Sequence, residues 1–189
     1  MEHDREAQLQ SLFEAHYAAV LAYARRRSRD VTLAEEAAAD VFVVAWRKLD
    51  RVPDDARPWL FAVARRSIAN LRRAELRRQR LIDRVVARDV TRAAPDPTHA
   101  LARNDAFARA YARLSAVDRE VLALVAWEGL DREQAARALE CSKAVFAVRL
   151  HRARQRLRAE LAGASDEAGV DQTEAPHEGD AVPQGRSGS

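Results

Sequence analysis

The chain has 189 residues, a length that suits one domain or two small ones. Hydrophobic residues make up 48% of it, enough for a buried core, whereas six glycines and six prolines are too few for a turn-rich β sandwich or barrel. A single cysteine excludes a disulfide framework and a cysteine-based zinc site. No apolar run is long enough to span a membrane and the first residues lack an apolar signal core, so we expect a cytoplasmic protein.

Charge is distributed unevenly along the chain. There are 32 Lys and Arg against 29 Asp and Glu, a formal net charge of +3. Residues 162–189 hold six acids and one base, a net charge of −5, so the preceding residues carry +8. Nearly all of the bases are arginine, a bias that a GC-rich genome also produces. A basic body with an acidic tail indicates a polyanionic partner, most simply nucleic acid.

The first half of the chain predicts three helices. Apolar residues recur at helical spacing over 4–29. Thr32 and Glu35 have the spacing of a capping box, which predicts a helix over 32–49. A Pro-Asp-Asp break follows, and then a long helix over 57–84, amphipathic at first and mostly arginine afterwards. Two prolines in 89–98 end this half, and the segment is long enough for the two halves to lie well apart.

The second half predicts four helices, over 98–113, 116–128, 132–140 and 143–161. Ser115 and Asp131 are predicted N-caps, and Gly129 and Gly163 are predicted helix ends. The predicted fold is all-α, with two small helical domains, a flexible linker and a disordered acidic tail. The expected boundaries are 5–84 for the first domain, 85–98 for the linker, 99–161 for the second domain and 162–189 for the tail.

The last two predicted helices have the pattern of a helix-turn-helix. The second of them has six bases and no acid over 143–158, which suits a recognition helix that contacts DNA phosphates. A solvated basic face on an ordinary helical hairpin gives the same pattern. The single Cys141 falls in the turn, where we expect a small packed residue rather than a nucleophile.

Two further segments carry candidate functions. The long helix has eight arginines over 65–84, with Trp59 and Phe61 just before them, a combination that suits single-stranded nucleic acid. Core packing is the alternative for the aromatic rings. Acids near the start of the helix 33–49 suit either a docking surface for a basic protein or a favourable helix start. The five histidines lack metal spacing and no glycine-rich phosphate loop occurs, so we expect no metal, no cofactor and no enzyme.

In order along the chain, these segments resemble the bacterial RNA polymerase sigma factors of the extracytoplasmic-function (ECF) class. Residues 34–47 resemble region 2.2, residues 57–73 resemble regions 2.3 and 2.4, and residues 114–157 resemble region 4. The resemblance covers about residues 8–161. It implies two partners, the polymerase core (its β′ clamp helices and β flap) and promoter DNA, and relatives are often held by an anti-sigma factor.

The resemblance also implies three sets of site residues. The core-binding set is Glu35, Glu36, Asp40 and Trp46. The −10 DNA set is Arg57, Arg65, Arg66, Asn70, Arg72 and Arg73, with the loop 50–57 as the rim of a base pocket and Asn70 as the base-contacting amide. The −35 DNA set is Lys143, Val148, Arg149, Arg152, Arg154 and Arg156.

Two features of the helix-turn-helix depart from the family pattern. Glu140 stands in the helix-turn-helix turn, where many members have glycine. Residues 144–148 are apolar, where the recognition helix usually begins with small and polar residues, so Ala147 or Val148 would contact a thymine methyl or a protein partner. The rival reading is a stand-alone helix-turn-helix repressor or activator, which needs a dimer interface that the sequence does not display.

Overall fold

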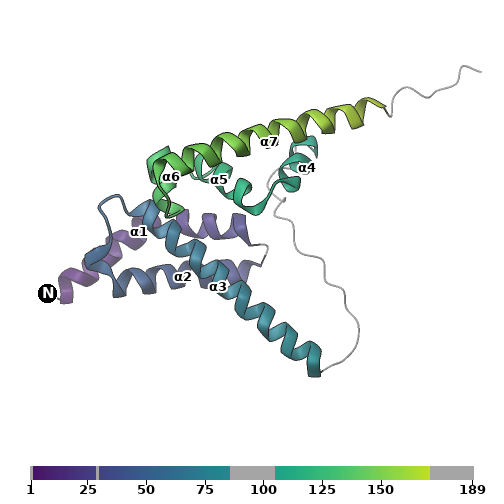
Figure 1. The fold of residues 1–189 in the computed structure, drawn as a ribbon. Coiled ribbons are helices and arrows are strands. Elements are labelled where there is room, and N and C mark those ends of the chain that lie inside the picture. The colour runs from purple at the N-terminus through teal and green to yellow at the C-terminus, as the bar shows by residue number, and fades with distance from the viewer. Residues whose placement is uncertain (1, 29, 86–104, 171–189) are drawn as a thin grey trace, which may run out of the picture.

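The computed structural model describes residues 2–28, 30–85 and 105–170, and within these ranges the chain is helical without a strand (Figure 1). The predicted all-α class is confirmed. Most of the predicted linker, and residues 171–189 of the predicted tail, lie outside the described residues. The elements are α1 (Glu2–Arg27), α2 (Val31–Arg47), the 3-10 helix η1 (Leu49–Arg51), α3 (Ala56–Val85), α4 (Asp105–Arg113), α5 (Ala116–Ala126), α6 (Arg132–Ala138) and α7 (Lys143–Val170).

Helices α1, α2 and α3 pack on one another as the N-terminal unit (Figure 1). The inner face of α2 is lined by small residues at helical spacing, Ala34, Ala37, Ala38 and Val41, all fully buried. Small side chains let α1 and α3 approach α2 closely, so the three helices share one core. Trp59 is partly buried against this core, which agrees with the alternative that this ring serves core packing.

The start of α2 corrects the predicted capping box. The N-cap is Asp30, whose carboxylate accepts a hydrogen bond from the Leu33 backbone N–H at 3.2 Å. Thr32 therefore lies inside the first turn of the helix, and its predicted role as the cap is wrong. Aspartate and threonine are both good N-caps, and the earlier of the two residues caps the helix here.

Helices α4 to α7 form the C-terminal unit, and its predicted caps are confirmed. Ser115 Oγ accepts from the Asp118 N–H at 3.1 Å, and Asp131 and Gln134 form a reciprocal capping box. After α5, Gly129 adopts a φ of +64°, and the Leu130 N–H donates to the Leu124 carbonyl at 3.0 Å. The left-handed φ of Gly129 turns the chain away from α5, although this hydrogen bond spans one residue more than that of a Schellman motif.

The last helix is longer than the sequence predicts. α7 passes through Gly163 and continues to Val170, so the predicted end at 161 and the stop at Gly163 are wrong. A single glycine weakens a helix without ending it. Phe146, Leu150 and Ala153 are buried at helical spacing and hold the first half of α7 on the unit's core.

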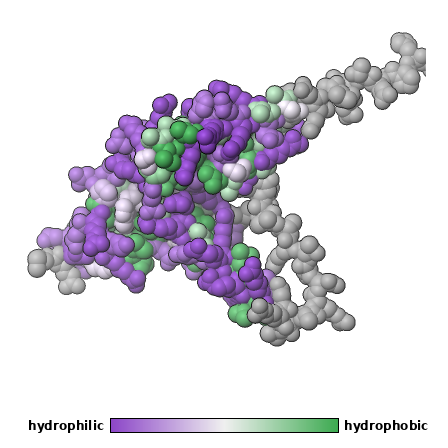
Figure 2. All heavy atoms as spheres, viewed as in Figure 1, coloured by the Kyte–Doolittle hydropathy of each residue, from purple (hydrophilic) through white to green (hydrophobic). Residues whose placement is uncertain are grey.

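The two units contact each other rather than lying well apart. α3 packs against α6 (Figure 1). The buried apolar side chains of both units form one continuous cluster. Hydrophilic residues cover most of the face shown in Figure 2. No helix among the described residues is both long enough and apolar enough to span a bilayer.

Candidate nucleic-acid interface

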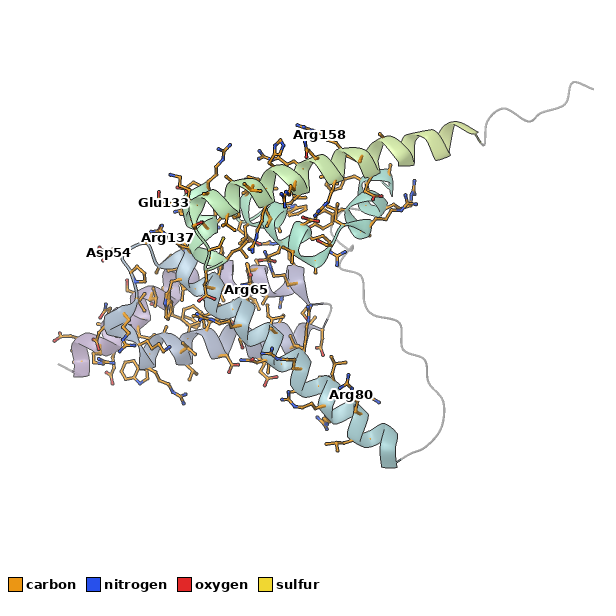
Figure 3. The ribbon with its side chains drawn as sticks, viewed as in Figure 1. Asp54, Arg65, Arg80, Glu133, Arg137 and Arg158 are labelled. Atoms are coloured by element: carbon orange, nitrogen blue, oxygen red, sulfur yellow. The ribbon has the colours of Figure 1, made fainter. Side chains whose placement is uncertain are left out.

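Helix α3 carries the predicted −10 residues along its length. Arg57 lies in the first turn, with its guanidinium carbon 5.5 Å from the Phe61 ring centroid. Arg65 and Arg66 lie in the middle, close to α6, whereas Arg80 is on the part of α3 that extends beyond α1 and α2 (Figure 3). The helix is therefore a basic rod whose first half is packed in the protein and whose second half is exposed.

Asn70, Arg72 and Arg73 lie where α3 leaves the core. Asn70 and Arg73 are exposed, and Arg73 Nη2 donates to Asn70 Oδ1 at 2.6 Å. Arg72 donates to the backbone carbonyl of Arg27 at the end of α1. Burial lowers the pKa of Arg72, although a guanidinium remains charged at neutral pH. Asn70 thus presents an amide beside the guanidinium of Arg73, which suits contact with a base next to a phosphate.

The predicted core-binding residues lie on α2 but do not share a single face. Glu35 Oε1 pairs with Arg25 of α1 at 3.1 Å, whereas Asp40 Oδ2 accepts from Ser67 Oγ of α3 at 2.7 Å. Glu36 is exposed. Glu35 and Asp40 are thus directed to different neighbouring helices. Glu36 is the acid of the predicted core-binding set whose carboxylate is exposed without an ion pair to another helix in the described part of the chain.

Beside this acidic end, α1 and α2 enclose an apolar groove of about 730 Å³. Phe13 and Val43 line it with 42% and 48% of their surface exposed, and Trp46 closes one end under the guanidinium of Arg5. Exposed aromatic and branched side chains around a concave surface are typical of protein interfaces. Trp46 belongs to the predicted core-binding set, and Phe42 and Val43 lie in the segment that resembles region 2.2. The contribution of α1 to the groove was not predicted.

Helix α7 presents the predicted −35 residues. Val148, Arg149, Arg152 and Arg154 are exposed, and Figure 3 shows Arg158 on the side of α7 away from the N-terminal unit. Lys143 Nζ lies 3.4 Å from Glu133 of α6. Arg156 differs from the others, because its guanidinium lies 2.6 Å from the buried carboxylate of Asp118 and neutralises it.

A polar network between the units was not foreseen. Glu128, only 1% exposed, pairs with Arg26 and with Arg27 Nη1 at 2.7 Å, and Glu120 pairs with Arg27 Nε at 2.7 Å. The Tyr23 hydroxyl donates to Glu120 Oε1 at 2.8 Å, and burial raises the Tyr23 pKa well above its usual value. Burial alone would lower the pKa of Arg27, but Tyr23, Glu120 and Glu128 raise it above its usual range. The buried charges of one unit are thus compensated by the other.

No group of His, Cys, Asp and Glu side chains in the described part of the chain has the arrangement of a metal site. The lone Cys141 is a free, half-buried thiol packed against the core. The potential of this protein for binding therefore lies in its basic helices and in the groove beside α2.

Comparison with known proteins assigns both units. The sigma-70 region 2 family matches residues 12–81, and the sigma-70 region 4 family matches residues 104–157. The ECF RNA polymerase sigma factor SigL of Mycobacterium tuberculosis is 30% identical over 158 residues, which cover 82% of this chain and 89% of SigL. The RNA polymerase sigma factor CnrH of Cupriavidus metallidurans is 31% identical over 161 residues, 79% of this chain and 84% of CnrH.

Solved structures agree with these relatives. The sigma factor RpoE of Bartonella quintana, in complex with the anti-sigma factor NepR, superposes with a TM-score of 0.57 at 25% identity, over 80% of this chain and 95% of that chain. CnrH in complex with the cytosolic domain of CnrY gives a TM-score of 0.55 at 26% identity, over 82% and 88% of the two chains.

The N-terminal unit is thus a sigma-70 region 2 and the C-terminal unit a region 4. The chain belongs to the ECF class of RNA polymerase sigma factors. It directs transcription initiation, with the polymerase core and promoter DNA as its partners.

Proposed function

We propose that this sigma factor divides its partners between separate surfaces. The acidic end of α2 and the apolar groove beside it dock on the core polymerase. Helix α3 captures the unpaired −10 strand, and α7 lies along the upstream DNA near the −35 element. In this proposal the protein acts in the cytoplasm and performs no covalent chemistry.

The separation of charge carries the proposal. α3 from Arg65 to Arg84 has eight bases and two acids, and α7 from Lys143 to Arg158 has six bases and no acid. The exposed acid Glu36 lies on α2, beside the groove. Basic helices suit phosphates, because neutralised phosphates release counterions, and an acidic and apolar surface suits a basic protein helix.

Within the DNA surface, the arginines and Asn70 have different tasks. Arg65, Arg66, Arg72 and Arg73 hold the strand through its phosphates, which positions it without reading sequence. Asn70 is exposed and can donate and accept at once, so it is the residue we assign to direct contact with a −10 base. The loop before α3 forms the rim of the pocket for that base.

Region 4 supplies a second contact with DNA. Arg149, Arg152 and Arg154 contact phosphates, and the exposed Val148 contacts a thymine methyl in the major groove. Arg156 belongs to this set by position, but its pairing with Asp118 assigns it first to holding α7 on α5. The relatives are bound by anti-sigma factors. An inhibitory partner of this kind could bind the same surfaces of region 2 or region 4.

Reconstituted run-off transcription tests the function. Core polymerase is incubated with sheared genomic DNA, with and without this protein, and the 5′ ends of new RNA are mapped. New starts that share an upstream −10-like element are the expected result. Promoter binding by the protein without any new start would contradict it and favour a stand-alone repressor.

A charge reversal tests the docking surface separately. Glu36→Lys should weaken binding to core polymerase in the absence of DNA, because it places a cation where a basic partner helix is proposed to bind. Glu75→Lys is the matched control, since Glu75 is an equally exposed acid on α3, outside the docking surface. Equal affinities of the two variants would show that α2 is not the docking helix.

A further inference from the structure

Region 4 covers part of the surface that the proposed function assigns to the −10 strand. Asp55, in the loop before α3, pairs with Arg137 of α6 and accepts from Gln134 Nε2 at 3.1 Å. Figure 3 shows Arg137 and the neighbouring Asp54 at the same junction, where α6 meets that loop. The loop proposed as the pocket rim is therefore held by the other unit.

The turn that follows α6 contacts the strand-binding arginines themselves. Glu140 Oε2 lies 3.0 Å from Arg65 Nη2, and Glu140 Oε1 lies 2.9 Å from Arg66 Nη1. One carboxylate thus bridges two guanidinium groups, one oxygen to each. A DNA phosphate carries the same sign of charge and would use donors of the same two guanidinium groups. Glu140 and a phosphate therefore compete for Arg65 and Arg66.

The backbone at Glu140 gives independent support for a dedicated contact. Glu140 has a φ of +54°, and the Cys141 N–H donates to the Ala136 carbonyl at 3.0 Å. After α5, the residue with a left-handed φ is a glycine, Gly129. Glycine is favoured at such a position because a side chain there is strained. Glu140 occupies it against that preference, and its carboxylate lies on Arg65 and Arg66.

We propose that Glu140 is an intramolecular latch, which holds region 4 over the −10 strand-binding surface of region 2 and stands in for a DNA phosphate on Arg65 and Arg66. In the closed chain these arginines are occupied, and the strand binds only after region 4 has moved away. This inference rests on the proposed strand-binding role of the two arginines.

Equilibrium binding of a fluorescein-labelled single-stranded oligothymidylate to the free, full-length chain at low salt tests the latch. Glu140→Gln removes the charge and keeps the size of the side chain. Glu160→Gln is the matched control, because Glu160 is a similarly exposed acid of region 4 whose partner, Arg113, lies in the same unit. Both variants change the net charge equally, so their difference isolates the contact with α3.

We expect Glu140→Gln to bind the strand about fivefold more tightly than Glu160→Gln, the effect of losing two half-exposed ion pairs that compete with DNA. Equal affinities of the two variants would overturn the latch. In a background with Arg65→Ala and Arg66→Ala, the difference between the two glutamine variants should disappear.

The arginine background also separates the two hypotheses. If the arginine double variant binds the strand as tightly as the unaltered chain, the proposed role of Arg65 and Arg66 is wrong. The second outcome is that the arginine double variant binds the strand more weakly, while Glu140→Gln and Glu160→Gln, with both arginines present, bind it with equal affinity. In that case the strand-binding role stands and the latch alone is refuted.

Discussion

Glu128→Gln should open the contact between regions 2 and 4 without unfolding either of them. Glu128 is 1% exposed and lies on Arg26 and Arg27, so both of its ion pairs cross between the units. Removal of one partner from a buried ion pair costs about 3–5 kcal/mol. Arg26 is 34% exposed and Arg27 keeps Glu120, so we expect a cost below that range, about 2–3 kcal/mol.

This cost applies to the closed arrangement, because water solvates all three side chains once the units separate. About 2 kcal/mol corresponds to a shift of roughly thirtyfold toward the open chain. Spin labels at the exposed Arg47 of α2 and Arg158 of α7, in a Cys141→Ala background, report the change as a broader and longer distance distribution. Glu160→Gln is the control, and its distribution should match that of the unaltered chain.

The thermal unfolding of each unit should be nearly unchanged in Glu128→Gln, since the lost ion pairs hold no helix of either unit to its own core. An unaltered distance distribution would refute the reasoning, because it would mean that the apolar contacts alone keep the units closed. A loss of helical signal would refute it in another way, by showing that Glu128 is required for the fold of region 4.

Three further predictions concern stability. Phe146→Ala should destabilise region 4 by about 3–5 kcal/mol in chemical denaturation, because Phe146 is fully buried in its core; a loss below 1 kcal/mol would show that the site collapses around the cavity. Asp30→Ala should cost about 1 kcal/mol and Thr32→Ala much less, since Asp30 caps α2; the reverse order would restore the capping box that the sequence predicts. Burial, followed by the charge of Arg57, lowers the pKa of His16 in the folded protein. The free energy of unfolding should therefore rise with pH between the folded and unfolded pKa values of His16. Denaturation curves at a series of pH values measure this slope, and His16→Gln should remove it.

The sequence predicts the helices well, because each depends on neighbouring residues. The Ser115 and Asp131 caps and the glycine end at Gly129 are local features, and all are confirmed. The errors at Thr32 and Gly163 are local too. In both cases two signals competed within a few residues, and the sequence does not rank them.

The contacts between the units were out of reach for a different reason. Arg26 and Arg27 end α1, whereas Glu128 lies just after the end of α5, about a hundred residues further along the chain. The two arginines have the pattern of exposed cations favoured at a helix C-terminus, and Glu128 has the pattern of an ordinary exposed acid. Nothing in either segment specifies its partner. The α1 side of the groove was missed for a related reason, because Phe13 has the spacing of a core residue and only the packed structure leaves it exposed.

The accessibility of the two proposed surfaces differs in the closed chain, and this difference leads to a last prediction. Region 4 contacts Asp55, Arg65 and Arg66, whereas Glu36 and the groove around Val43 stay exposed. If these surfaces act as proposed, the closed chain can begin docking on polymerase before it can bind DNA. If polymerase holds regions 2 and 4 at separate sites, its apparent affinity is reduced by the fraction of chains that are open.

Glu128→Gln should then tighten the binding of core polymerase, by up to the roughly thirtyfold gain in the open fraction. Fluorescence anisotropy of the labelled sigma factor, titrated with core polymerase, measures this directly, with Glu160→Gln as the control. A gain shows that opening precedes full docking and that the ion pairs of Glu128 oppose it. Equal affinities, together with a longer distance distribution in the free variant, would mean that polymerase accepts the closed chain and that the separation of the two regions is driven by DNA.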